Sequence, residues 1–145
     1  MTIRSALETP LVRPELPAEH RYVNIVSACL AALMERVDAI AEREAVVYNI
    51  QLAVHEACTN IVDHAYHGQA GGRIKVELSL VGVPRQLIVD LYDNGRPFAG
   101  LQTPAPELDE PQTHGYGLFL MQALVDDVQY ERPGGRNHWR LSKQL

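Results

Sequence analysis

The sequence predicts a two-layer α+β domain in which helices cover one face of a mixed, mostly antiparallel sheet. Two observations support this fold class. Two long segments have apolar residues at three- and four-residue steps, the pattern of amphipathic helices. Several shorter segments alternate apolar and polar residues around turns that contain Gly or Pro, the pattern of β-hairpins. Hairpin-linked strands form antiparallel sheets, and helices commonly cover one face of such a sheet.

The chain has the size and composition of one globular domain. Its 145 residues can form one sizeable core, and 46% hydrophobic and 21% charged residues are ordinary values. The net charge of −5 argues against nucleic acid as a direct partner, because phosphate binding needs clustered Lys and Arg. No apolar run approaches the ~20 residues that span a bilayer, and no signal peptide is visible. We therefore expect a single domain over residues 1–145, cytoplasmic and without a membrane partner.

The predicted elements follow one another in a simple order. A short edge strand and a loop are expected within residues 2–12, before the first helix. Residues 96–114 have no clear period and contain four prolines, so we expect a lid or a mobile loop there. The other elements are helices at 18–37, 41–66 and 118–125, and strands at 74–80, 87–91, 128–130 and 138–141.

A stripe of polar side chains runs along the second predicted helix. At 100° per residue one narrow sector contains Asn49, Glu56, Asn60, Asp63 and His67. The stripe is either the solvated face of an amphipathic helix or the lining of a pocket, and taken alone it favours the solvated face. Asn60 favours the pocket, because Asn is a poor helix former and its amide oxygen is a good ligand for Mg²⁺. Glu56, one turn earlier, could then orient or deprotonate an attacking hydroxyl.

Asp93 ends the inward-facing row of the second central strand. The sequence Asp93-Asn94-Gly95 is typical of a turn, and a turn is one interpretation. An adenine site is the other. A carboxylate only accepts hydrogen bonds, so at a buried strand end it suits the exocyclic amine of adenine and rejects the carbonyl oxygen of guanine. Gly95 would let the backbone pass close to the base.

Gly115 and Gly117 precede the third predicted helix. Glycines at a helix N-terminus expose backbone amides to a phosphate, although a lone Gly-x-Gly is also an ordinary helix entry. The pattern is neither a Rossmann fingerprint nor a Walker motif. The six histidines show no metal-ligand spacing, so we expect no zinc site. Cys29 and Cys58 are interpreted as buried apolar residues in a reducing compartment, and nothing in the sequence indicates that Cys58 is a nucleophile.

Three segments resemble the N, G1 and G2 boxes of the GHKL ATP-binding superfamily, which has the Bergerat fold. They are the helical segment with Glu56 and Asn60, the strand end at Asp93-Asn94-Gly95, and the glycines at 115 and 117. Within that superfamily, residues 52–66 closely resemble the anti-sigma-factor serine/threonine kinases, and so do residues 117–121 and 126–128. The resemblance covers the chain from about residue 20 to its end. The sequence of the N box is specific for this family, and that of the G1 box is less specific.

The resemblance implies a role for several residues. Glu56 matches the catalytic base, Asn60 the Mg²⁺ ligand and Asp93 the adenine contact, and residues of the lid at about 96–114 would cover the ATP. Asn137 stands where many relatives have Gly-Thr, and it is expected to replace the threonine hydroxyl. The further residues expected to contact the nucleotide are Asp63, His64, Gly95, His114, Gly115, Tyr116, Gly117 and Leu118.

The resemblance also implies a biological activity. Kinases of this family sequester a sigma factor and phosphorylate a serine or threonine on an antagonist with a STAS domain, and they are often dimers. Two alternatives remain open at this point. One is an ATP-dependent sequestering module with little or no kinase activity, and the other is the catalytic domain of a histidine kinase. The chain offers no room for a dimerising phosphoacceptor hairpin, which places the second alternative last.

Two departures from the family pattern bear on catalysis. Pro97 stands where the second box usually has its second glycine, and it stiffens the start of the lid. Residues 97–131 contain no Lys or Arg, whereas phosphoryl transfer normally needs a cation besides Mg²⁺ near the γ-phosphate. Arg96, His114 or an arginine from a partner could supply this charge. Without one of them, the sequence predicts slow transfer or none.

Overall fold

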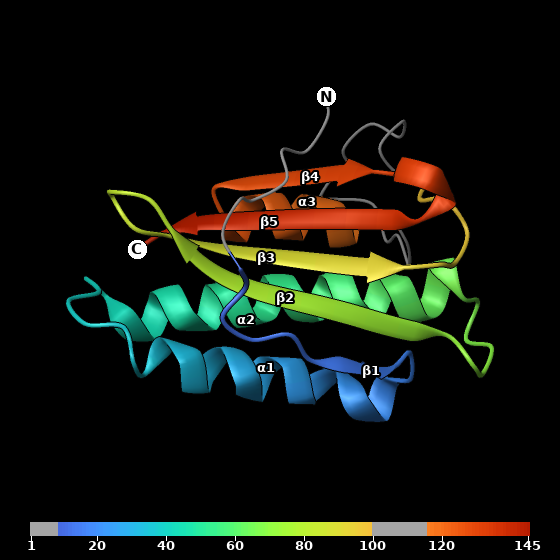
Figure 1. Ribbon diagram of the computed structural model, residues 1–145, viewed down its shortest axis with the longest axis horizontal. Helices are drawn as coiled ribbons and strands as arrows, with labels where there is room; N and C mark the ends of the chain where they lie inside the picture. Colours follow the sequence, from blue (N-terminus) through green and yellow to red (C-terminus); the bar gives the residue numbers. More distant parts are fainter. Residues whose placement is uncertain (1–8, 100–115) are drawn as a thin grey trace.

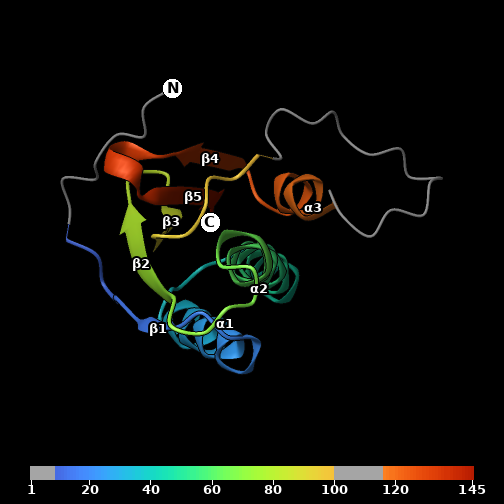
Figure 2. The ribbon, with the colours of Figure 1, turned by 90° about the vertical axis from the view of Figure 1, so that its right-hand side faces the viewer.

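The described part of the protein forms two layers, a five-stranded sheet and three helices packed on one of its faces (Figures 1 and 2). The computed structural model describes residues 9–99 and 116–145. In chain order the elements are β1 (Glu15–Pro17), α1 (His20–Met34), α2 (Arg43–Asn60), a π-helical turn (Ile61–Ala65), β2 (Arg73–Val81), β3 (Gln86–Asp93), α3 (Tyr116–Leu124), β4 (Asp127–Glu131), a 3-10 turn (Pro133–Gly135) and β5 (Asn137–Gln144).

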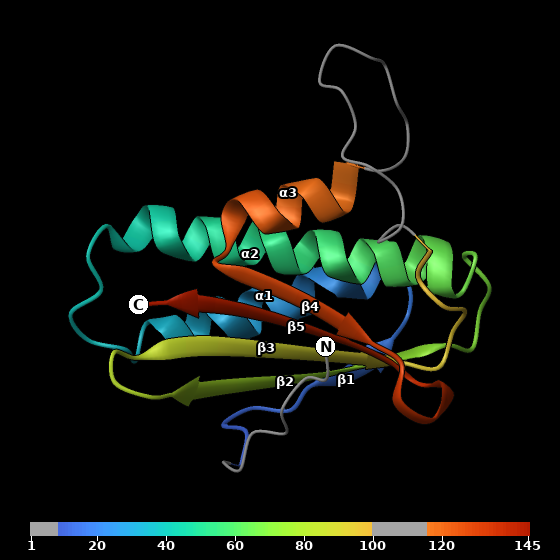
Figure 3. The ribbon, with the colours of Figure 1, turned by 90° about the horizontal axis from the view of Figure 1, so that it is seen from above.

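The strand order in the sheet is β1-β2-β3-β5-β4, and every neighbouring pair is antiparallel. The α+β class with helices on one face is therefore confirmed. Figure 3 shows α2 in the middle of the helical layer, with α1 and α3 on either side of it. None of the helices among the described residues is both long and apolar enough to cross a bilayer.

The core lies between the helices and the inner face of the sheet. On β3 the side chains of Leu87, Val89 and Leu91 are buried in this core, and Asp93 continues the same row at the strand end. This alternation is what the sequence predicted, because successive side chains of a strand point to opposite faces. Trp139 is likewise buried on the inner face of β5, where it belongs to the core.

Two boundaries differ from the sequence prediction. The N-terminal edge strand is β1 at Glu15–Pro17; Val12 makes only an isolated bridge to Leu78, and residues 1–8 of the expected strand lie outside the described part. The second helix does not continue regularly to residue 66. It changes to a π-helical turn after Asn60, and His67 then has a positive φ of 54°. The polar stripe predicted along a regular helix is therefore interrupted after Asn60.

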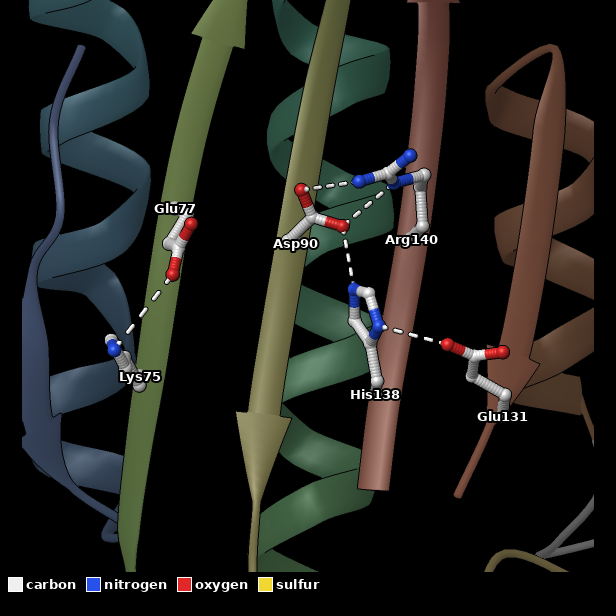
Figure 4. A network of polar contacts seen from close by, with 6 residues as sticks. All are labelled: Lys75, Glu77, Asp90, Glu131, His138 and Arg140. Carbon is white, nitrogen blue, oxygen red and sulfur yellow. Dashed lines mark hydrogen bonds and ion pairs between the residues drawn. The ribbon is translucent and has the colours of Figure 1, made fainter. Parts of the chain in front are cut away.

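The outer face of the sheet, which none of the described helices covers, has its own polar network (Figure 4). Asp90 on β3 is only 3% exposed, and it accepts hydrogen bonds from Arg140 Nε at 2.7 Å and Arg140 Nη2 at 3.2 Å. His138 Nε2 lies 2.6 Å from the same carboxylate, and Glu131 lies 3.6 Å from His138 Nδ1. Burial alone would raise the pKa of Asp90, but the hydrogen bonds from His138 and Arg140 outweigh it and hold the pKa below its usual range. These contacts join β3, β5 and β4.

We predict that Asp90→Ala destabilises the fold by about 1–3 kcal/mol, because it removes the carboxylate that the buried His138 and the partly buried Arg140 contact. The matched control is Glu77→Ala on the same face, whose contact with Lys75 is more exposed and spans 3.8 Å. That change should cost less than about 1 kcal/mol. Urea unfolding of both variants at neutral pH measures the difference.

The Asp90 contribution also has a defined pH dependence. Since folding lowers the pKa of Asp90, the stabilisation is complete above the pKa of the unfolded chain and is lost as the pH falls through the folded value. Unfolding in acid should therefore show a smaller pH dependence in Asp90→Ala than in wild type. Equal pH profiles would contradict the assignment.

Candidate nucleotide site

The C-terminal ends of α2 and β3 meet at one end of the molecule (Figure 1). The chain leaving β3 crosses the π-helical turn at such close range that Gly95 has no space for a side chain. A Cβ on Gly95 would lie 2.4 Å from the carbonyl oxygen of Ala65. The next amide, Arg96 N, donates to that same oxygen at 2.8 Å. The requirement for glycine at position 95 therefore comes from contact with the π-helical turn.

Tyr66 fixes this crossing from the other side. Its hydroxyl donates to Arg73 O at 2.9 Å and accepts from Asn94 N at 2.8 Å, so it ties the start of β2 to the end of β3. A Cβ on Gly72 would lie 2.7 Å from the Tyr66 ring, so Gly72 leaves the space that the ring fills. The result is a fixed distance between the end of α2 and Asp93. π-helical turns often occur at functional sites.

Asp93 is a buried carboxylate with one oxygen in use and one oxygen free. It is 2% exposed. Its Oδ1 accepts from Gly95 N at 2.9 Å and from Asn137 Nδ2 at 2.7 Å. Its Oδ2 is buried and has no hydrogen-bond partner among the described residues. Burial raises the pKa of Asp93, and the hydrogen bonds from Asn137 and Gly95 and the charges of Arg132 and Arg136 only partly oppose this effect.

An unpaired buried acceptor is costly unless something donates to it, so it indicates a ligand with a donor group. The exocyclic amine of adenine is such a donor. The prediction that Asp93 accepts from adenine fits this geometry, and the turn interpretation is satisfied at the same time through Oδ1 and Gly95.

Asn137 sits directly opposite Asp93 in the register between β5 and β3. It is 1% exposed. Besides Asp93, its amide nitrogen donates to Arg96 O at 2.8 Å, and its oxygen accepts from Arg132 Nη1 at 2.6 Å and from the Tyr130 hydroxyl. In this structure Asn137 therefore contacts the carboxylate expected to bind adenine.

Asn60 lies at the end of α2 and faces the start of α3. A Cβ on Gly117 would lie 2.7 Å from Asn60 Nδ2 and 3.0 Å from Asn60 Oδ1, so the absence of a side chain leaves room for the Asn60 amide. Glu56 lies one turn earlier on the same helix and is partly exposed. Residues four apart lie on one face of a helix, so both side chains are on the side toward α3. The arrangement fits an amide metal ligand with a carboxylate beside it, next to a glycine at a helix N-terminus.

The structure gives less information on the other residues that were expected to contact the nucleotide. Asp63 and His64 are exposed on the π-helical turn, where His20 Nε2 lies 2.7 Å from Asp63 Oδ1. Leu118 is partly buried and packs against the core. Tyr116 is the first residue of α3. His114, Gly115 and residues 100–114 of the expected lid lie outside the described part of the chain, so these assignments and those of the residues above stay predictions.

Two residues of the site were not expected from the sequence. The Tyr130 hydroxyl donates to Asn137 and accepts from Phe98 N at 2.9 Å. Arg132 donates from one nitrogen to Asn137 and to Gly95 O, the latter at 3.0 Å. The only signal for Arg132 was its place at the end of a strand, directly before the turn Pro133–Gly135. Burial raises the pKa of the Cys58 thiol to about 12, which agrees with its interpretation as an unreactive core residue.

Comparison with known proteins identifies the family of this chain. Residues 16–143 match the family model of the histidine kinase-like ATPase domain. The chain belongs to this family of ATPase domains and, within it, to the family of the serine-protein kinases RsbW. It is 31% identical over 133 residues to RsbW from Bacillus pumilus (86% of this chain and 80% of that protein), and 32% identical over 124 residues to RsbW from Listeria innocua (79% and 75%).

Solved structures show the same fold. The RsbU and RsbW domains of Rv1364c from Mycobacterium tuberculosis match with a TM-score of 0.60 and 18% identity, over 94% of this chain and 33% of that one. The histidine kinase domain of the EL346 blue-light activated kinase from Erythrobacter litoralis matches with a TM-score of 0.52 and 22% identity, over 90% of this chain and 62% of that one. This chain thus spans about a third of the first solved chain and less than two thirds of the second.

We predict that Asp93→Asn weakens ATP binding by roughly 1–3 kcal/mol, the scale of one buried hydrogen-bond partner lost. The amide can keep Oδ1 as an acceptor for Gly95 and Asn137, but it places an NH₂ group where the free acceptor was. Because the raised pKa shows that the buried charge costs stability, the unliganded variant should melt no lower than wild type.

Calorimetry with ATP and GTP and a thermal melt measure both effects. The matched control is Asp90→Asn, the same change three residues earlier on the outer face of β3, which should leave the ratio of ATP to GTP affinity unchanged. Equal affinity of the wild-type protein for ATP and GTP would remove Asp93 from the adenine site.

Proposed function

We propose that this protein is an ATP-dependent serine/threonine kinase of the anti-sigma-factor type, which uses Mg²⁺. The observation that carries the proposal is the free, buried Oδ2 of Asp93 at the point where β3 meets the end of α2. A single acceptor in a buried site selects adenine over guanine, because guanine would set a carbonyl oxygen against the carboxylate. Membership in the histidine kinase-like ATPase family and the likeness to serine-protein kinases RsbW support the same function.

Each residue of the site then has a defined task. Asp93 holds the adenine amine, and Asn60 holds Mg²⁺ through its amide oxygen. When bound, ATP supplies the transferable γ-phosphoryl group and Mg²⁺ offsets its charge. Glu56, one turn before Asn60, accepts the proton of the attacking serine or threonine hydroxyl. Asp63, His64, Gly117 and Leu118 are the further residues that we propose to line the nucleotide site, together with His114, Gly115 and Tyr116.

Phosphoryl transfer needs a cation near the γ-phosphate in addition to Mg²⁺. Whether the protein has one decides between a kinase and a module that only sequesters its partner. Arg132 is engaged by Asn137 and Gly95 O near the adenine end, so it is not available for phosphate. Arg96 follows β3 and is exposed beside the π-helical turn, with Nη2 3.1 Å from His67 Nδ1 and 3.4 Å from His64 O. We propose Arg96 or an arginine of the partner as the cation. If neither serves, the protein sequesters its partner with little or no transfer.

The partners that we propose follow from the family. They are a sigma factor, which the protein sequesters, and a STAS-domain antagonist, which it phosphorylates. We further propose that the protein acts as a homodimer in the cytoplasm, without direct contact with nucleic acid. The resulting activity is regulation of transcription by partner switching.

We predict that Glu56→Gln keeps ATP affinity within about twofold and loses phosphoryl transfer by roughly 10²–10⁴-fold, because the amide preserves the shape and cannot accept a proton. The assay uses labelled ATP and the cognate STAS-domain partner. Glu44→Gln is the matched control, since Glu44 lies in the first turn of the same helix, three turns away from Glu56.

Two outcomes would contradict this assignment. Normal transfer by Glu56→Gln would show that this carboxylate belongs to the solvated face of α2. Wild-type protein that holds ATP beside its verified partner without labelling it would refute the kinase and leave the sequestering module.

We predict that Asn60→Ala removes most of the Mg²⁺ dependence of ATP binding and leaves the fold intact. The reason is that the amide faces Gly117 at the start of α3 and makes no hydrogen bond that holds the helices together among those the structure gives. ATP affinity is measured with Mg²⁺ and with EDTA. Asn49→Ala, three turns earlier on α2, is the control, and an unchanged Mg²⁺ dependence in Asn60→Ala would exclude the ligand role.

A further inference from the structure

We propose that Arg132 is a positioning residue for adenine recognition, which acts through Asn137 and leaves Oδ2 of Asp93 as the acceptor. This inference rests on the proposed nucleotide site. Arg132 follows β4, more than thirty residues beyond Asp93, and it does not contact that carboxylate. Its influence passes through one side-chain amide, and the direction of each hydrogen bond can be assigned by chemistry.

The first step is the orientation of the Asn137 amide. A guanidinium only donates hydrogen bonds, so the atom of Asn137 that lies 2.6 Å from Arg132 Nη1 must be the oxygen. The Tyr130 hydroxyl accepts from Phe98 N at 2.9 Å, and its own hydrogen is therefore directed to the same oxygen. Two donors thus exclude the flipped amide, in which an NH₂ group would face the guanidinium.

The second step is the use of the amide nitrogen. It donates to Asp93 Oδ1 at 2.7 Å and to Arg96 O at 2.8 Å, with a longer hydrogen bond to Gly95 O at 3.4 Å. Gly95 N also donates to Oδ1, at 2.9 Å. Oδ1 is then satisfied by two donors and Oδ2 by none among the described residues. The carboxylate has one defined free acceptor because the amide has one defined orientation.

The third step concerns the charge of Asp93. Burial disfavours the ionised form, and the hydrogen bonds from Asn137 and Gly95 and the positive charges of Arg132 and Arg136 oppose that effect. A protonated Oδ2 would donate a hydrogen bond and could no longer accept from the adenine amine. Arg132 therefore acts in two ways, by turning the amide donor toward Oδ1 and by favouring the ionised carboxylate.

Arg136 offers a control for the second of these effects. Its guanidinium lies 4.3 Å from the centre of the Tyr92 ring on the outer face of the sheet, and its charge also lowers the pKa of Asp93. It makes no hydrogen bond to Asn137 among those the structure gives. Arg136→Met removes a charge near Asp93 and leaves the amide oriented, whereas Arg132→Met removes both.

The experiment is a double-mutant cycle read by nucleotide preference. Affinities for ATP and GTP with Mg²⁺ are measured by calorimetry for wild type, Arg132→Met, Asn137→Ala and the double variant, with Arg136→Met as control. We expect Arg132→Met to lower ATP affinity roughly tenfold, the scale of a lost hydrogen bond to a charged group, with a much smaller change for GTP. In the Asn137→Ala background the same change should add little, because Arg132 acts through the missing amide.

Three results would overturn the inference. They are an unchanged ratio of ATP to GTP affinity in Arg132→Met, full additivity in the cycle, or an equal fall of the ratio in Arg136→Met. A thermal melt identifies a variant that fails to fold. In that case Tyr130→Phe, which deletes one hydroxyl, tests the other donor to Asn137, and an unchanged ratio there counts against the inference as well. A wild-type protein without preference for ATP would instead overturn the nucleotide site itself, and this inference with it.

Discussion

The contact between Gly95 and the carbonyl of Ala65 decides where the site can form. It brings the end of a strand against the end of a helix, and the distance of 2.4 Å for an added Cβ leaves no room for any side chain at position 95. The π-helical turn at Ile61–Ala65 presents that carbonyl, and Arg96 N satisfies it. Because backbone cannot yield as a flexible side chain can, Asp93 and the end of α2 are held at a fixed separation.

The sheet contains one buried carboxylate on each face, and the environments of the two differ. On the outer face Asp90 is held by Arg140 and His138, and the pKa of this group is lowered. On the inner face Asp93 keeps one oxygen unpaired, and its pKa is raised by burial. The first arrangement stabilises the fold. The second costs stability in the unliganded protein and is explained by a ligand that donates to the free oxygen, as expected where stability is exchanged for function.

Most of the fold could be predicted from the sequence, because period-2 and helical patterns depend on local burial. Asp93 was identified at the strand end for the same reason, since its row was Leu87, Val89 and Leu91. The π-helical turn could not be predicted, because nothing in residues 61–65 breaks the helical pattern. Gly95, which packs against Ala65, lies far along the chain from this segment. The role of Arg132 could not be predicted either. This residue carries no pattern of its own, and its role arises only when β5 places Asn137 opposite Asp93.

The proposed nucleotide site therefore divides into two parts with different origins. The part at Asn60 and Glu56 lies on one helix, where a spacing of four residues is enough to bring the groups together. The part at Asp93 is built from residues of β3, β5 and the segments that follow β3 and β4. The directions of the hydrogen bonds among these residues leave one oxygen of Asp93 free. A motif can specify the first part, whereas the second depends on the tertiary fold. In the function that we propose, adenine selection is accordingly a property of the ends of β3 and β5, and the chemistry at the phosphate is a property of α2.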